Sequence, residues 1–341
     1  MPPMLIFAAA TLTPVPLIAL AAWQGGIWVL LALATLTLLV AMLDHLVARA
    51  LPALPDQEFP VADGLSVVLA VAHAGLLALA VAALAGNWLA PWEKLGLFAA
   101  AGLFFGQISN SNAHELIHRP GRGLHSLGMW VYISLLFGHH TSAHPLVHHR
   151  LVGTRADPST ARLGEGLYRF AWRAWTGSFR AGWRSEQARL RQTGGASWRH
   201  PYVIYLGGAA LMLGLAVAAG GVLPYLALCG FAQFQLLMSD YVQHYGLSRA
   251  LGPAGKPVPI SPQQSWNAPH PASSALLLNA PRHSDHHARP SRRFPALDLA
   301  AGVPMLPHSL PVMACVALIP GLWRRLMDPR ARAVLAAIKQ P

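Results

Sequence analysis

The segment LSVVLAVAHAGLLALAVAALAGN at residues 65–87 decides the fold, because it carries no Asp, Glu, Lys or Arg. A helix that crosses a bilayer needs about 20 consecutive, mostly apolar residues. Further segments of the same kind lie at 4–23, 26–43, 94–113, 201–220 and 222–241. The sequence therefore predicts an all-α integral membrane protein built on a bundle of six spanning helices.

The composition agrees with a membrane protein. Hydrophobic residues make up 54% of the chain and charged residues 11%, whereas about a quarter of a soluble domain is charged. The net charge of +12 would suit nucleic acid in a soluble protein, but the arginines lie beside apolar segments, so a membrane surface fits better. The chain has two cysteines, Cys229 and Cys315, which are too few for a four-thiolate metal site. Both lie in apolar runs, and a disulfide framework is therefore unfavourable.

The polar sequence is concentrated in two long stretches, residues 114–200 and 242–341. Both are rich in arginine, and basic loops usually stay on the cytoplasmic side of a membrane. We therefore expect both stretches and both termini to be cytoplasmic, and residues 1–341 to form a single domain. The first span is expected to be retained and to kink at Pro14 and Pro16. Gly25 with Gly26, and Gly220 with Gly221, are expected to form the tight turns of two helical hairpins.

Four histidine clusters lie in or beside these polar stretches. They are HELIH at 114–118, HPLVHH at 144–149, the histidine of DYVQHYG at 240–246, and HSDHH at 283–287. The nine candidate metal ligands are His114, His118, His144, His148, His149, His244, His283, His286 and His287.

The spacing within the clusters favours shared ligation, because residues three or four apart lie on one face of a helix. The sets expected to point at one place are His114 with His118, His144 with His148, and His283 with His286 and His287. Pro145 is tolerated in a first helical turn, so that helix is expected to begin near His144. Nine imidazoles exceed what one ion binds, which predicts a dinuclear metal site in a helical cytoplasmic cap.

Other interpretations of the histidines remain open. A single His-x-x-x-His pair arises by chance on surface helices, and a histidine can simply face a helix dipole. Imidazole suits zinc, copper, iron and nickel, and a structural zinc protein is one alternative, although such sites often use thiolate. A membrane metal transporter or sensor is another, but it would place ionisable residues at mid-membrane depth.

Side chains near the clusters are candidates for orienting the ligand rings. These candidates are Glu115, Asp157, Asp240, Asp285 and His139. Each carboxylate can equally be a helix cap or a solvated charge, and His139 can equally lie on the surface. No side chain beyond the metal centre is predicted to be catalytic.

These motifs resemble the bacterial alkane 1-monooxygenases of the membrane fatty acid desaturase/hydroxylase superfamily. The resemblance covers residues 114–118, 138–165, 241–246 and 266–290, and RHSDHHARP at 282–290 is its most specific part. The chain departs from the family pattern at Ala143, where Glu is usual, and at Asp240 and Gln243, where Asn and Glu are usual. These departures bear on substrate and turnover and leave the nine histidines intact.

The resemblance implies a non-haem di-iron monooxygenase that hydroxylates the terminal carbon of alkanes to primary alcohols with O₂. It implies two irons on the nine histidines, an apolar substrate drawn from the bilayer, and location in the bacterial inner membrane. The chain has no Gly-x-Gly-x-x-Gly and no Cys-x-x-Cys, so an external electron carrier is expected. The resemblance implies that this carrier is a rubredoxin or ferredoxin with an NAD(P)H-dependent reductase. The arginine-rich face is expected to meet this carrier or membrane lipids, and no nucleic acid. A fatty-acyl, xylene or terpene hydroxylase or desaturase of the same superfamily remains the nearest alternative.

Overall fold

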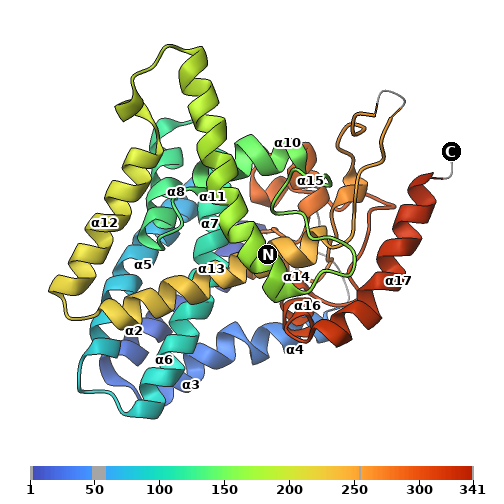
Figure 1. Ribbon diagram of the computed structural model, residues 1–341. Helices are drawn as coiled ribbons and strands as arrows, with labels where there is room; N and C mark the ends of the chain where they lie inside the picture. Colours follow the sequence, from blue (N-terminus) through green and yellow to red (C-terminus); the bar gives the residue numbers. More distant parts are fainter. Residues whose placement is uncertain (1–2, 48–58, 253–254, 340–341) are drawn as a thin grey trace.

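The computed structural model describes residues 3–47, 59–252 and 255–339, and Figure 1 shows that helices dominate it. No β-strand occurs within these ranges; isolated bridges join Leu251 to Pro257 and Asn267 to Met305. The prediction of an all-α chain is confirmed.

Four helices are long and apolar enough to cross a membrane. They are Met4–Gln24, Ile27–Leu46, Pro60–Ala85 and Val222–His244. The last two are the continuous helices α5 and α13. These helices make the chain a membrane protein.

The first two of these spans are each interrupted. The first consists of α1 (Pro3–Leu12) and α2 (Pro14–Gln24) and breaks before Pro14, as predicted, because proline cannot donate a backbone hydrogen bond. The second consists of α3 (Ile27–Leu36) and α4 (Leu38–Leu46). It breaks at Thr37, whose hydroxyl donates a 2.6 Å hydrogen bond to the carbonyl of Leu33. That break was not predicted.

The other two predicted spans are helical but differ from regular spanning helices. Segment 94–113 is divided among α6 (Pro91–Leu103), the π-helical turn η1 (Phe104–Ser109) and α7 (Asn110–Ile117). Segment 201–220 contains α12 (Tyr202–Ala218), which has 17 residues, less than the usual spanning length. A bundle of six spans therefore remains a prediction.

Both expected helical hairpins form around glycine. Gly25 and Gly26 have φ of 65° and 57° between α2 and α3, and Gly220 has φ of 67° between α12 and α13, a region that favours glycine. The carboxylate of Glu93 accepts a 2.6 Å hydrogen bond from the amide of Gly26 and a 2.7 Å bond from that of Ala90. This contact ties the first hairpin to the start of α6.

The remaining elements, among them the apolar helix α16, form a layer that carries most of the histidines. Its elements up to α12 are α8 (Arg122–Ser134), α9 (His140–Ala143), η2 (His144–His148), α10 (His149–Leu151), α11 (Leu167–Gln192) and η3 (Ser197–Arg199). Those after α13 are η4 (Pro262–Gln264), α14 (Pro271–Leu276), α15 (His283–Ala288), η5 (Phe294–Ala296), α16 (Leu310–Ala317) and α17 (Pro320–Lys339).

Two contacts fix this layer on the apolar helices. The buried carboxylate of Asp44, near the end of α4, accepts hydrogen bonds of 2.8 and 3.0 Å from the amides of Ala272 and Ser273. These amides open α14 and have no partner within that helix, so the carboxylate stabilises its first turn. The second contact joins α17 to the spanning helix α13. Trp323 of α17 is fully buried, and the centroid of its ring lies 5.2 Å from that of Tyr241 in α13.

Candidate metal centre

The nine predicted ligands lie together in two groups. The first group contains His114, His118, His144, His149 and His286, and the second contains His148, His244, His283 and His287. In each group one nitrogen from every ring lies within 4.8 Å of the others. The four clusters, far apart in sequence, thus converge at the ends of α7 and α13, on η2 with α10, and on α15.

The grouping corrects the expected pairing of His144 with His148. In a regular α-helix these residues would share a face, but η2 is a π-helical turn, which is wider by nearly one residue. His144 therefore joins His149, five positions later, while His148 belongs to the second group. Pro145, which supplies no amide hydrogen, favours such a departure from the α-helical hydrogen bonds. The helical run begins earlier than expected, at His140.

The expected trio on α15 is also divided. His283 and His287, four residues apart, lie in the second group, whereas His286 joins the first. As a result, η2 with α10 and α15 each supply ligands to both groups. The rings of His149 and His287, one from each group, have centroids 4.5 Å apart, so the two groups are adjacent.

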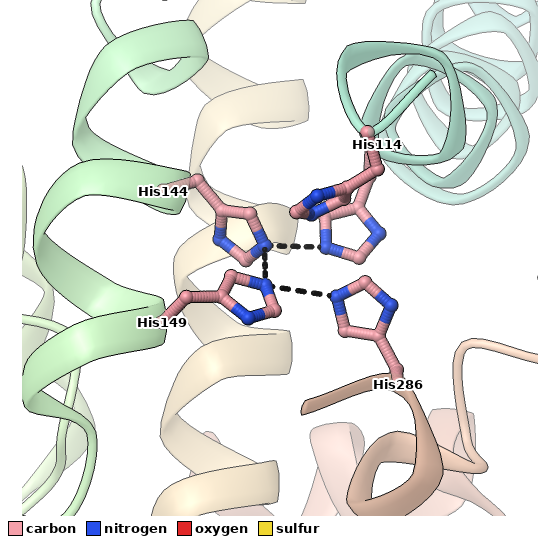
Figure 2. A group of neighbouring side chains, drawn as sticks. His114, His144, His149 and His286 are labelled. Atoms are coloured by element: carbon pink, nitrogen blue, oxygen red, sulfur yellow. Dashed lines mark hydrogen bonds between the residues drawn. The ribbon is translucent and has the colours of Figure 1, made fainter. Parts of the chain in front are cut away.

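Figure 2 shows that four rings of the first group point toward one another. The Nε2 atom of His144 lies 2.7 Å from that of His114 and 2.9 Å from that of His149. His149 Nε2 lies 3.0 Å from His286 Nε2. A neutral imidazole has one nitrogen that carries a hydrogen and one that keeps a free lone pair. Ring nitrogens that converge on one point can therefore each offer a lone pair to a metal ion bound there.

In the second group, outer partners set the ring tautomers. His244 Nδ1 lies 2.9 Å from the carbonyl oxygen of Gln264 and His148 Nδ1 lies 2.8 Å from Asp157 Oδ2. Both partners are acceptors, so each Nδ1 carries the proton and each Nε2 keeps its lone pair. Hydrogen bonds of this kind orient metal-binding histidines and raise their basicity.

Asp157 is held as a carboxylate by this arrangement. Burial opposes its charge, but the His148 ring, the Thr160 hydroxyl at 2.6 Å and the Ser159 amide at 3.0 Å outweigh burial and lower its pKa. Burial likewise opposes a charge on His148, and the Asp157 carboxylate reverses that effect and raises the pKa of His148. The pair forms a carboxylate–histidine unit with Nε2 directed away from Asp157.

The protonation state of the rings and their unpaired nitrogen atoms also fit the binding of metal cations. Burial, followed by the neighbouring imidazoles, holds the pKa of His283, His286 and His287 well below its ordinary value, so these rings are neutral at pH 7. The Nε2 atoms of His118 and His148 are buried, and neither has a hydrogen-bond partner among the described residues. Buried polar atoms are normally paired, and bound metal would satisfy both.

The other four candidates for orienting the ligands have different partners. Glu115 pairs with Arg119 at 2.9 Å and accepts from the Phe294 amide; burial raises its pKa to about 7 despite Arg119. Asp285 pairs with Arg289 and Arg292. These carboxylates hold the surrounding backbone in place.

His139 and Asp240 complete the set. His139 is buried, and its Nε2 lies 3.3 Å from the Ser178 hydroxyl. Asp240 is buried, and its Oδ2 has no hydrogen-bond partner in the described ranges. Among the five candidates, Asp157 is the one that the structure places in hydrogen-bond contact with a predicted ligand.

A cavity of about 450 Å³ opens onto both histidine groups. His114 and His144 of the first group and His283 of the second line its inner end, beside Asp240. Its walls come from α4, η1, α13 and α16, and most of its surface is apolar. This central cavity gives an apolar molecule access to both groups.

Sequence reasoning identified little of the cavity wall. The aromatic residues Phe104 and Phe105 are fully buried outside it, whereas their neighbours Leu103 and Gly106 line it. His140 lines it as well, with its ring stacked 5.0 Å from that of His144. The burial of His140 and its position one turn before His144 were the available signals.

Replacing Asp157 with asparagine is expected to weaken metal binding by the second group about 10–100-fold, the usual effect of losing such a partner. The amide keeps the shape but loses the charge that favours the correct His148 tautomer. Metal affinity measured by competition with a chelator tests this. Glu165→Gln is the matched control, because Glu165 is also a buried carboxylate but pairs with Arg173; equal affinity in D157N and the unmodified protein would contradict the expectation.

Fold and site together define a helical membrane protein with a buried, histidine-rich centre that can hold metal. Comparisons with known proteins identify the family to which this chain belongs. Residues 86–315 match the profile of the fatty acid desaturase family. Alkane 1-monooxygenase 2 of Pseudomonas aeruginosa is 32% identical over 324 residues, which cover 91% of this chain and 85% of that protein.

Two further relatives are informative. An alkane 1-monooxygenase of Pseudomonas putida is 34% identical over 246 residues, or 70% of this chain and 60% of that protein. The hydroxylase component of a xylene/toluene monooxygenase of Pseudomonas putida is 28% identical over 330 residues, or 91% and 84%. The chain therefore belongs to the alkane 1-monooxygenase family within the fatty acid desaturase superfamily, which confirms the resemblance.

Proposed function

We propose that this protein is an O₂-dependent monooxygenase that hydroxylates the terminal carbon of alkanes to primary alcohols. The observation that carries the proposal is the central cavity, an apolar space that reaches the imidazoles of both histidine groups. An alkane has no polar group for a protein to recognise, so an apolar enclosure next to the oxidising centre is the feature its binding requires.

The outer part of the cavity supports substrate access from the bilayer. Its outer lining includes the exposed residues Leu38 and Ala41 of α4 and Val312 and Cys315 of α16. The break at Thr37, which also lines the cavity, interrupts the second span beside this opening. Alkanes partition into lipid, so a lateral opening between α4 and α16 would admit them without passage through water.

Iron is the metal we propose, with two ions held by the first and second groups. When bound, the irons supply the activation of O₂ for insertion of one oxygen atom into a C–H bond. The described chain contributes the nine imidazoles, the Asp157 carboxylate that orients His148, and walls that exclude water. The buried polar residues Asp240 and His140 line the same cavity as His114 and His144, and we place the reacting carbon beside them.

We further propose that an external acidic electron carrier, a rubredoxin or ferredoxin, docks near the first group. Three rings of that group, including His118 and His149, are only partly buried, whereas the second group is fully buried. Arg122 and Arg150, which follow these ligands in sequence, are exposed. Positive charge beside the more accessible group would steer an acidic partner to it.

Arg150→Glu is accordingly expected to lower the second-order rate of reduction by the carrier roughly tenfold at low salt. The difference should shrink as ionic strength rises, because salt screens exposed charges. Stopped-flow reduction at several salt concentrations measures this. Arg191→Glu is the control, since Arg191 is equally exposed at the far end of α11; the same loss in both variants would count against this docking position.

The proposed location is the bacterial inner membrane, with both termini and the histidine layer on the cytoplasmic side. The excess of arginine in residues 114–200 and 242–341 supports this orientation. A cytoplasmic centre also places the carrier where NAD(P)H-dependent reductases operate.

The decisive experiment combines metal analysis with product analysis on purified protein. About two irons per chain and conversion of octane to 1-octanol are expected when a carrier, its reductase and NADH are present. Oxidation of xylene or an acyl lipid without octane oxidation would reassign the substrate class. A single zinc per chain with no turnover would overturn the monooxygenase proposal.

A further inference from the structure

A groove of about 460 Å³ lies between α11 and α12, and we call it the α11–α12 groove. Figure 1 shows these two helices diverging from the segment that connects them, residues 193–201. One wall includes Trp175 and Arg180 of α11, and the other includes Leu206 and Ala209 of α12. Among the described residues, none of those lining it also lines the central cavity. Its volume lies within the range of about 300–1,000 Å³ that is usual for small-molecule sites.

One face of α11 beside the groove carries exposed aromatic side chains. They are Tyr168, Trp172, Trp175 and Trp183, with exposed fractions between 39% and 69%. At 100° per residue they fall within an arc of about 80° on the helix. Trp175 also donates a 2.9 Å hydrogen bond to Gln233 of the spanning helix α13. Tryptophan and tyrosine are enriched at the headgroup level of membranes, so this face is suited to contact with lipid.

The other wall of the groove belongs to a helix whose outer surface is apolar and exposed. Val203, Ile204, Leu206 and Leu211 of α12 are each 50% exposed or more. A contiguous apolar surface of this kind normally meets a membrane or another partner, and α12 leads directly into the spanning helix α13. Acyl chains are therefore the natural neighbours of this wall.

The groove also carries positive charge that the protein does not neutralise. Helix α11 contains six arginines and one glutamate. Arg173 pairs with Glu165, whereas neither Arg180 nor Arg184 has an ion pair in the part of the chain that the structure describes. These two arginines are exposed and lie one turn apart on α11. No carboxylate lines the groove within the described ranges. A ligand with an anionic head and an apolar chain matches both properties of the groove.

We propose that the α11–α12 groove binds an anionic phospholipid, whose phosphate pairs with Arg180 and Arg184 while an acyl chain lies against Leu206 and Ala209. Guanidinium groups bind phosphate oxygens through paired hydrogen bonds, and basic pockets between membrane helices bind anionic headgroups. The cation of a choline headgroup would lie beside the arginines without a carboxylate to pair with. A soluble acidic protein would satisfy the arginines but leave the apolar walls unfilled. None of the nine candidate metal ligands lines this groove, so the binding of lipid here is independent of the proposed oxidation.

The test is titration of the purified full-length protein with two phospholipids, followed by native mass spectrometry. Dioleoyl phosphatidylglycerol and dioleoyl phosphatidylcholine have the same acyl chains and differ in headgroup charge. The first phosphatidylglycerol is expected to bind roughly tenfold more tightly than the first phosphatidylcholine, in line with the attraction of arginines for anionic lipid. Glycerol 3-phosphate at the same concentration should not displace it, because it lacks the chains. Equal affinity for the two lipids, or displacement by glycerol 3-phosphate, would overturn the proposal.

Variants place the bound lipid on the chain. The double variant Arg180→Gln with Arg184→Gln should bind the two lipids about equally, whereas Ala209→Trp, which narrows the groove from α12, should weaken the binding of both. Arg191→Gln is the matched control, because Arg191 is an exposed arginine of α11 outside the groove, and it should keep the full preference. A preference that persists in the double variant, or an equal loss in R191Q, would refute the site. Lipid-free dimers in place of lipid adducts would assign this face to a second copy of the chain instead. Should the double variant fail to fold, the titrations of the unmodified protein still decide.

Discussion

His283→Ala is expected to remove about one metal ion per chain and to lower hydroxylation more than about 100-fold, a larger effect than loss of an orienting partner. The second group has four imidazoles and would keep three. His283 Nε2 lies 3.0 Å from His244 Nε2 and 3.2 Å from His287 Nε2, and His283 also lines the central cavity. Elemental analysis and turnover of octane on the same preparation measure both effects.

His308→Ala is the matched control for this variant. His308 is an exposed histidine in the same C-terminal part of the chain and lies in neither group. It should retain full metal content and turnover. If H283A bound as much metal as the control and turned over octane at the same rate, the second group would not be a metal site.

Ala41→Trp is expected to lower turnover of long alkanes about tenfold or more while leaving metal content unchanged. Ala41 is an exposed residue of α4 that lines the central cavity at its outer part. A tryptophan there would obstruct the opening between α4 and α16, and changes of shape in apolar pockets alter discrimination by about 10–200-fold. Steady-state rates on a series of alkanes measure the effect, and shorter chains should be less affected.

Met42→Trp controls for the added aromatic group. Met42 is the next residue of α4, is 53% exposed and does not line this cavity. Comparable losses in the two variants would show that the added ring disturbs α4 or its lipid contacts in general. An unchanged alkane profile in A41W would rule out this route to the centre.

The sequence predicted the convergence of the nine histidines better than it predicted their arrangement. All nine histidines converge as expected because several types of evidence agreed: spacing, ligand chemistry and the resemblance of the motifs. Their division into groups of five and four depends on the π-helical turn at η2, which the regular helix period does not anticipate. Pro145 was the local signal, and it was interpreted as a helix start.

The apolar helices show the same limit. Charge-free segments such as 65–87 predicted helix with little ambiguity, and glycine pairs marked the hairpin turns. The approach of α16 to α4 could not be predicted, because it brings together segments near the two ends of the chain. The break at Thr37 carries no proline or glycine to mark it in the sequence. Composition determined where helices form, and tertiary contacts determined where the central cavity opens.

The wide turn at η2 also has a consequence for protein engineering. On a regular α-helix, a residue five positions after His144 would lie about 140° around the helix from it. Placing the HPLVHH sequence on such a helix would therefore turn His149 away from the first group, although every histidine was still present. A transplanted copy of this centre therefore needs the irregular backbone as much as it needs the imidazoles.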